Sequence, residues 1–277
     1  MDLHFILGGA LVGFIVGATG VGGGSLMTPL LTLVFNVPAQ VAVGTDLLFA
    51  SLTKASGAVA HARRGSVQWR ITGLLVAGSV PAALITLGAV HVLKPDSVLF
   101  ADIVKRTLGV ALFLTAGALV FKTQIQALGQ RLLAGTTSFA GLATAGGGSG
   151  YLAVSDTRLT RPAPTIAIGV VIGTLVTLTS VGAGVIGVVA LFFLYPLLPT
   201  RQIVGSDIAH AVPLTLVAGL GHVSLGNVNW SMLGMLLIGS VPAIHLGAAV
   251  AHRLPERALR LALSTMLVGI GVRLVLG

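Results

Sequence analysis

Long apolar stretches fill most of the chain, and short polar stretches separate them. About 20 apolar residues are needed to cross the roughly 30 Å core of a bilayer. The pattern predicts an all-α polytopic membrane protein with two sets of three transmembrane helices, each preceded by a longer apolar segment whose middle is rich in glycine. The predicted helices cover 41–61, 70–93, 105–122, 202–223, 230–252 and 257–276, and the glycine-broken segments cover 3–36 and 163–198.

The two sets are copies of each other. Residues 61–82 and 222–243 share eleven identities in 22 aligned positions, at a constant offset of 161. The two tryptophans of the chain are repeat mates, and each opens an apolar helix, as an interfacial aromatic anchor does. We predict a single transmembrane domain over 1–277, built from a first repeat (1–122), a connecting loop with a short helix at 128–145 (123–162) and a second repeat (163–277).

The glycine-broken segments decide the topology, because each is too long for one ordinary span. If each is a re-entrant hairpin, eleven Lys and Arg of the loops lie on one side and four on the other; if each crosses once, the split is eight against seven. Cytoplasmic loops carry an excess of Lys and Arg, so the count favours hairpins. Three crossing helices per half then make the halves inverted repeats, the usual arrangement in transporters.

Composition narrows the function. The chain is 55% hydrophobic and 8% charged, with a mean hydropathy of +1.02. Its net charge of +9 comes mostly from Lys and Arg between apolar segments, which indicates topology rather than nucleic-acid binding. The absence of cysteine excludes disulfides and thiolate metal sites, and we expect no cofactor. The N-terminal segment lacks a basic region and a clear cleavage site, so we do not interpret it as a signal peptide.

The glycine tips are the first candidate site. Irregular backbone at membrane depth is tolerated where it is buried in protein or lines a wet cavity. The helix after each tip directs free N–H groups and a positive dipole end towards it, which suits an anion. The alternative is close helix packing by small residues. The candidate residues are Thr19, Gly20, Gly22, Gly23, Gly24 and Ser25 in the first tip and Thr179, Ser180, Gly182 and Gly184 in the second.

Two acids at matching positions are the second candidate site. Asp46 and Asp207 each lie near the start of a helix that follows a proline, so they either cap that helix or the tip, or act as protonatable groups beside the substrate. Lys54 lies too deep in its helix to reach the interface easily and can pair with an aspartate or attract an anion. His210 is one turn beyond Asp207, where a His–Asp pair is plausible. The hydroxyl groups that accompany the acids are those of Thr45 and Ser206.

These motifs resemble the TauE/SafE sulfite exporter family. The resemblance rests on Gly17–Leu31 and Ala42–Leu47 in the first half and on 179–184 and 204–207 in the second. It implies a multi-pass permease of the bacterial cytoplasmic membrane that moves anions such as sulfite, sulfonates or thiosulfate. The second half departs from the first, with Ala183 in place of Gly23 and no equivalent of Pro29, so the two tips are expected to contribute unequally.

We therefore predict a transporter rather than an enzyme. Its partners are a small anion, the bilayer and protons as a candidate coupling ion, with no nucleic acid, and it works by alternating access. A passive anion channel of the same architecture and a non-transporting scaffold are the alternatives. An intramembrane serine protease is a remote one, because Ser149 lies in a G-x-S-G pattern but in a glycine-rich connection.

Overall fold

The computed structural model describes residues 3–19, 24–93, 97–134, 161–182, 184–250 and 256–276. These residues form ten α-helices and no strand. The helices are α1 (Leu3–Thr19), α2 (Gly24–Leu33), α3 (Ala39–Arg63), α4 (Trp69–Leu93), α5 (Ser97–Ala134), α6 (Pro162–Thr179), α7 (Val185–Leu194), α8 (Thr200–Ser224), α9 (Trp230–Val250) and α10 (Glu256–Leu276). Within the described residues, five of them contain stretches long and apolar enough to cross a membrane: α4, α5, α6, α8 and α9.

Both glycine-broken segments are divided as predicted. The first contains α1 and α2, and the second contains α6 and α7. The two arms of each segment are unequal: α6 has 18 residues and can cross a bilayer by length, whereas α7 has 10. Helices α3 and α8 begin directly after Pro38 and Pro199, whose fixed φ suits the residue before a helix.

The prediction for the connection between the halves was partly wrong. α5 runs to Ala134 without a break, so residues 123–134 belong to a long helix and no separate helix begins at 128. Residues 123–134 contain Gln, Leu and Ala, which are good helix formers. The polar residues among them were interpreted as the sign of a loop. The remainder of the connection, including the glycine-rich motif around Ser149, lies outside the described residues.

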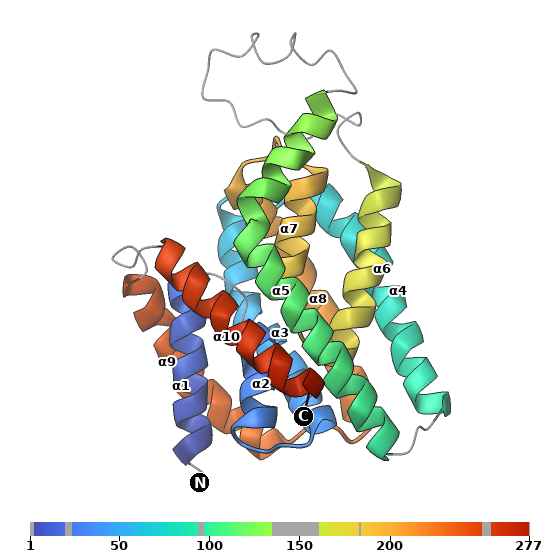
Figure 1. Cartoon of the computed structure of the whole chain (residues 1–277), viewed down its shortest axis with the longest axis vertical. Coiled ribbons are helices and arrows are strands. Elements are labelled where there is room, and N and C mark those ends of the chain that lie inside the picture. Colours follow the sequence, from blue (N-terminus) through green and yellow to red (C-terminus); the bar gives the residue numbers. More distant parts are fainter. Residues whose placement is uncertain are drawn as a thin grey trace.

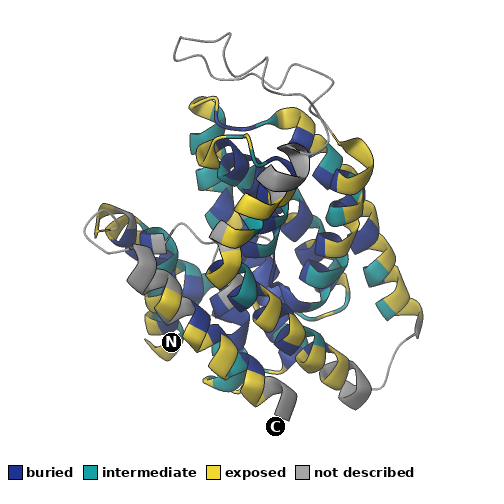
Figure 2. Cartoon of the chain, turned by 45° about the horizontal axis from the view of Figure 1, so that its top comes forward, coloured by how far each residue is buried: buried dark blue, intermediate teal, exposed yellow. Residues whose placement is uncertain are grey.

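The molecule has an apolar exterior and a mixed interior. Large side chains such as Ile85 and Val92 are 72% and 79% exposed on the outer helix faces, whereas two acids, several hydroxyls and a histidine are fully buried. Figure 2 shows the buried residues at the centre of the helical bundle and the exposed residues on its outer faces. Trp69 and Trp230 are both exposed at the starts of α4 and α9, as interfacial anchors require. This distribution fits a multi-pass membrane protein.

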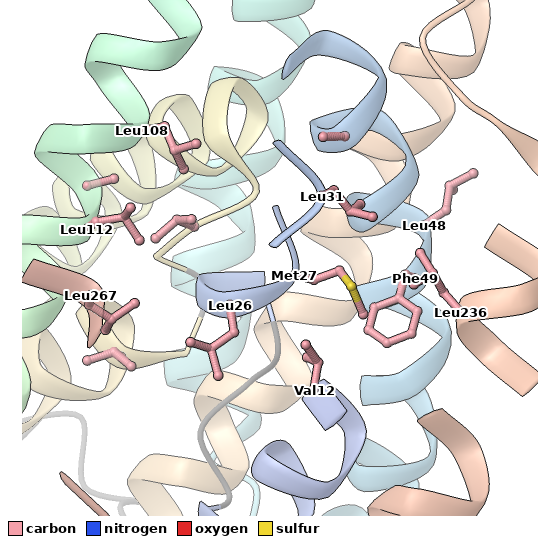
Figure 3. Close-up of a cluster of buried hydrophobic side chains, with 14 of the residues drawn as sticks. Val12, Leu26, Met27, Leu31, Leu48, Phe49, Leu108, Leu112, Leu236 and Leu267 are labelled. Atoms are coloured by element: carbon pink, nitrogen blue, oxygen red, sulfur yellow. The ribbon is translucent and has the colours of Figure 1, made fainter. Parts of the chain in front are cut away.

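The short helix α2 lies in the middle of the apolar core. Its Met27 and Leu31 are fully buried in a cluster that brings together α1, α3, α5, α9 and α10. Figure 3 shows Met27 near Phe49 of α3, with Val12 of α1 nearby. A ten-residue helix is marginal by itself, so these contacts hold it in place.

The two halves contact each other in reciprocal pairs. α1 packs along α9 and α6 packs along α4, on opposite flanks of the molecule (Figure 1). The backbone of Gly13 on α1 lies against Ser240 of α9, and that of Gly173 on α6 lies against Ser79 of α4. An added Cβ at either glycine would meet backbone atoms, so glycine permits this close approach. Contacts that exchange in this way are what a two-fold rotation between the halves produces.

Helices α3 and α8 form the centre of this arrangement and are antiparallel. His61, near the end of α3, lies beside Gly205 near the start of α8, and His222, near the end of α8, lies beside Gly44 near the start of α3. His222 is buried and its Nε2 is 2.9 Å from the carbonyl oxygen of Thr177. The centre of the molecule is therefore where equivalent residues of both halves meet.

Candidate functional site

The α6–α7 turn is the glycine tip that the structure describes. Ser180 ends α6 in the left-handed conformation (φ 58°), and Gly182 and Gly184 have φ of 113° and 142°. Such angles cost little for glycine and are uncommon for other residues. Gly184 is the residue before the first turn of α7, so the N-terminal end of that helix begins at the tip.

The hydrogen bonds of the second tip stabilise the turn itself. The hydroxyl of Thr179 donates to the carbonyl of Leu175 at 2.6 Å and accepts the N–H of Val181 at 3.1 Å. The N–H of Ser180 donates to the carbonyl of Val176 at 2.7 Å. These groups hold the tip in shape, and among the predicted residues here the Ser180 hydroxyl is the buried group without a hydrogen-bond partner.

The first tip is only partly described. Gly20, Gly22 and Gly23 lie outside the described residues. Thr19 ends α1 and Gly24 begins α2, while the side chains of Thr19 and Ser25 lie outside the described part. The role predicted for these six positions stays a prediction.

Asp46 is fully buried and is the eighth residue of α3. Its Oδ2 accepts a hydrogen bond of 2.6 Å from the hydroxyl of Thr28 on α2. The Ser180 hydroxyl of the second tip also faces this carboxylate, although Oδ1 has no partner that meets hydrogen-bond geometry. One acid of the first half therefore lies between α2 of its own half and the tip of the other half.

Asp207 occupies the matching position as the eighth residue of α8, but its surroundings differ. It is fully buried, and neither carboxylate oxygen has a hydrogen-bond partner. The backbone of Gly187 on α7 lies directly against it, where a Cβ would meet the carboxylate. Neither acid is in the first turn of its helix, so the prediction that they cap those helices is wrong.

Lys54 connects the two acids. It is 8% exposed on α3, two turns beyond Asp46, and interacts electrostatically with both Asp46 and Asp207. Both acids therefore act on the same lysine, which is consistent with the expected pairing of Lys54 with an aspartate. A buried cation next to carboxylates is far less costly than an isolated one.

His210 pairs with a serine rather than with Asp207. Its Nε2 is 2.8 Å from the hydroxyl of Ser79 on α4, and its Nδ1 has no partner. The predicted His–Asp pair is therefore not formed, because the neighbouring helix offers a hydroxyl at the correct distance. His210 is also close enough to Lys54 to interact with it electrostatically.

Thr45 and Ser206 hold the ends of the central helices. The Thr45 hydroxyl accepts the N–H of Asn229 at 3.1 Å, and the Ser206 hydroxyl accepts the N–H of Gln68 at 2.8 Å. The two bonds are repeat mates, and each ties a central helix to the loop before α9 or α4. The hydroxyls precede the acids in sequence, and these bonds fix that end of each central helix.

Three residues of the cluster were not singled out from the sequence: Thr28, Ser79 and Gly187. Thr28 lies in the motif after the first tip, and Ser79 is one of the identical repeat positions, so both carried a signal. Gly187 carried none, because a lone glycine in an apolar stretch is common. No group of three or more His, Asp or Glu able to hold a metal ion occurs within the ranges that the structure describes.

The chain matches known proteins over nearly its full length. A sequence model of the family described as "Sulfite exporter TauE/SafE" matches residues 5–274. The chain is 33% identical over 275 residues to the "Probable membrane transporter protein YjnA" of Bacillus subtilis, which covers 99% of this chain and 100% of that protein. It is 26% identical over 253 residues to YdhB of the same organism, named the same way, covering 91% of each chain.

A more distant relative comes from an archaeon. The "Probable membrane transporter protein MJ0441" of Methanocaldococcus jannaschii is 25% identical over 294 residues, which covers 96% of this chain and 94% of that protein. No solved structure matches the chain.

Proposed function

The chain belongs to the sulfite exporter TauE/SafE family of membrane transporters, and from that premise we propose that it carries sulfite or a related organosulfur anion across the bacterial cytoplasmic membrane. One observation carries the proposal: a buried cluster of a lysine, two acids, a histidine and the free hydroxyl of Ser180 lies where the two halves meet, inside an apolar exterior. Buried ionisable groups in a membrane protein mark transport pathways more often than structural roles.

The cluster contains the groups that an oxyanion requires. Lys54 supplies the positive charge, Ser180 supplies an unpaired hydroxyl, and the pair of His210 and Ser79 supplies further donors. The N-terminal end of α7 adds the positive end of a helix dipole from the tip. Sulfite presents three oxygens that can accept hydrogen bonds. A group of donors around one cation therefore suits sulfite better than it suits an apolar ligand.

We place the halves as inverted repeats. The reciprocal contacts support a two-fold axis between the halves, and the antiparallel pair of α3 and α8 supports an axis perpendicular to both helices. α8 is long enough to cross the membrane, so the axis then lies in the membrane plane. Alternating access by movement of one half against the other follows from such symmetry.

We also place α1–α2 and α6–α7 as re-entrant hairpins. The ring of Phe35 after α2 lies 5.2 Å from that of Phe5 in α1, and the hydroxyl of Tyr195 after α7 is 2.6 Å from that of Thr165 in α6. These two pairs are repeat mates, and in each the end of the segment returns to its beginning. These contacts support hairpins, in which both ends of a segment lie on the same side of the membrane.

The natural lack of cysteine allows a direct test of the hairpins. Val34→Cys and Ser224→Cys, both exposed positions, are expected to react with a membrane-impermeant maleimide from the same side of the membrane. Arg64→Cys and Leu197→Cys are expected to react from the opposite side. Single crossing of each broken segment would instead put the two members of each pair on opposite sides.

The function is tested by sulfite uptake into proteoliposomes, with and without an imposed pH gradient and with thiosulfate, sulfate and small sulfonates as competitors. We expect saturable sulfite flux that the pH gradient drives uphill. Flux that only follows the anion gradient would indicate a channel. Flux of another anion, but not of sulfite, would reassign the substrate, and flux of none would reject the transporter proposal for the purified chain.

A further inference from the structure

The two buried acids differ in what surrounds their oxygens. Asp46 accepts a short hydrogen bond from Thr28, and the Ser180 hydroxyl faces it. At the offset that pairs Gly23 with Ala183, the repeat mate of Thr28 is Val188, which has no hydroxyl. Neither oxygen of Asp207 has a hydrogen-bond partner. Hydrogen bonds to a carboxylate favour its ionised form, and a buried carboxylate without them is costly.

The charges of the cluster do not balance if both acids are ionised. Lys54 is the basic side chain that interacts with both Asp46 and Asp207, and one cation neutralises one carboxylate. The Nε2 of His210 is bonded to Ser79 rather than to an acid. Two ionised acids give the cluster an excess negative charge, so an anion can approach Lys54 while one of the acids is a neutral carboxylic acid.

Among the described residues, Lys54 of α3 is the charged side chain that acts on Asp207. Asp46 of α3 and His210 of α8 interact with the same lysine. The sequences of α6 and α7 contain no titratable residue, and those of α4 are Arg70 and His91, near the two ends of that helix. Arg201 is in the first turn of α8, well before Asp207.

We propose that Asp207 is the proton-binding group of this transporter, and that Asp46 stays ionised as the partner of Lys54. This assignment rests on the proposed function and states which acid couples protons to it. With the proton on Asp207, the pair of Lys54 and Asp46 leaves the cluster without net charge, and an anion can approach the lysine. When the proton leaves as H⁺, the second carboxylate competes for Lys54 and expels the anion.

The consequence is symport, in which the anion and the proton move in the same direction. The proton enters and leaves on one carboxylate oxygen of Asp207, with no other bond formed or broken. A monoanion and one proton then cross together without net movement of charge. The two acids, although repeat mates, have different tasks.

Infrared spectroscopy tests the assignment without relying on transport. The carbonyl stretch of a protonated carboxylic acid is expected at neutral pH in the full-length protein in lipid, and its position depends on hydrogen bonds to that acid. Thr28→Val, which removes the hydroxyl from Asp46, is expected to leave the band where it is. Asp207→Glu, which keeps the acid but changes its surroundings, is expected to move it, whereas Asp46→Glu is expected to leave it in place. A band that moves in Thr28→Val, or no band in the wild type, would overturn the assignment.

The pH dependence of sulfite flux gives the second readout. Asp207→Glu keeps the proton-binding acid but changes its surroundings, so it is expected to move the half-maximal pH of flux. Thr28→Val is expected to leave that pH unchanged. The opposite pattern would assign the proton to Asp46. If the wild type carries no anion, the proposed function fails, while the infrared result still decides which acid holds the proton.

Discussion

The acid sites of the two halves share a backbone and differ in chemistry. Both acids are the eighth residue of a central helix that follows a proline, and the hydroxyl before each is bonded to a loop of the other half. Around Asp46 are the hydroxyls of Thr28 and Ser180, whereas the backbone of Gly187 lies against Asp207 and neither of its oxygens has a hydrogen-bond partner. A duplicated fold has thus kept its frame and changed the contacts of its carboxylates.

A second difference concerns two serines, each two residues before the proline inside α4 or α9. Ser79 and Ser240 are repeat mates and both are fully buried. Ser79 is bonded to His210, whose repeat mate is Phe49, and Ser240 has no partner. The two serines at matching positions therefore have different polar surroundings. An anion bound at the centre would meet two unlike halves, which allows each half a separate role in the transport cycle.

The largest expected effect is that of removing the shared cation. Lys54→Met is expected to reduce sulfite flux by about 100-fold or more, because breaking a buried ion pair costs about 3–5 kcal/mol and leaves two acids without a counter-charge. Proteoliposome uptake at matched protein content measures it. Lys105→Met, at an exposed position of α5, is the control and is expected to transport normally. Equal loss in both variants would mean that Lys54 does not belong to the site.

The next effect probes the close approach to Asp207. Gly187→Ala places a methyl group against the carboxylate, so we expect loss of most flux and a lower melting temperature in detergent. Gly234→Ala is the matched control, because nothing lies within 4 Å of its added Cβ. If Gly187→Ala has wild-type flux and stability, α7 does not pack closely against Asp207.

A smaller effect separates the two buried serines. Ser79→Ala leaves His210 without its hydrogen bond, which costs about 1–3 kcal/mol, and is expected to lower both stability and flux. Ser240→Ala removes a buried hydroxyl that has no partner, so it is expected to be neutral or slightly stabilising. Thermal unfolding in detergent measures both variants. A similar loss of stability in the two would contradict the asymmetry of the halves.

The smallest effect concerns the hydroxyls that tie the central helices to the loops. Thr45→Val and Ser206→Ala each remove one bond to a backbone N–H, at a cost of about 1 kcal/mol each. Because the bonds are repeat mates, we expect equal shifts in melting temperature. A loss of sulfite affinity in one variant without a loss of stability would instead support the direct substrate contact that the sequence suggested.

Much of the architecture could be predicted from the sequence, because a membrane imposes strong constraints on it. The lengths of the apolar stretches and the offset between the repeats predicted the helices. The glycine-rich breaks predicted that both long segments are divided. Residues 123–134 were assigned wrongly, since polar helix formers in a long helix look like a loop. The first glycine tip remains a prediction, because most of it lies outside the described residues.

The sequence by itself determined that the chain is an internally duplicated membrane protein with paired tips, paired acids and one deep lysine. Only the tertiary structure decided that Lys54 serves both acids, that His210 bonds to Ser79 and that Asp207 has no hydrogen bond. The reason is physical. Hydropathy and spacing are local properties along the chain, whereas the partner of a buried polar group is chosen by which helices from distant parts of the sequence pack against it.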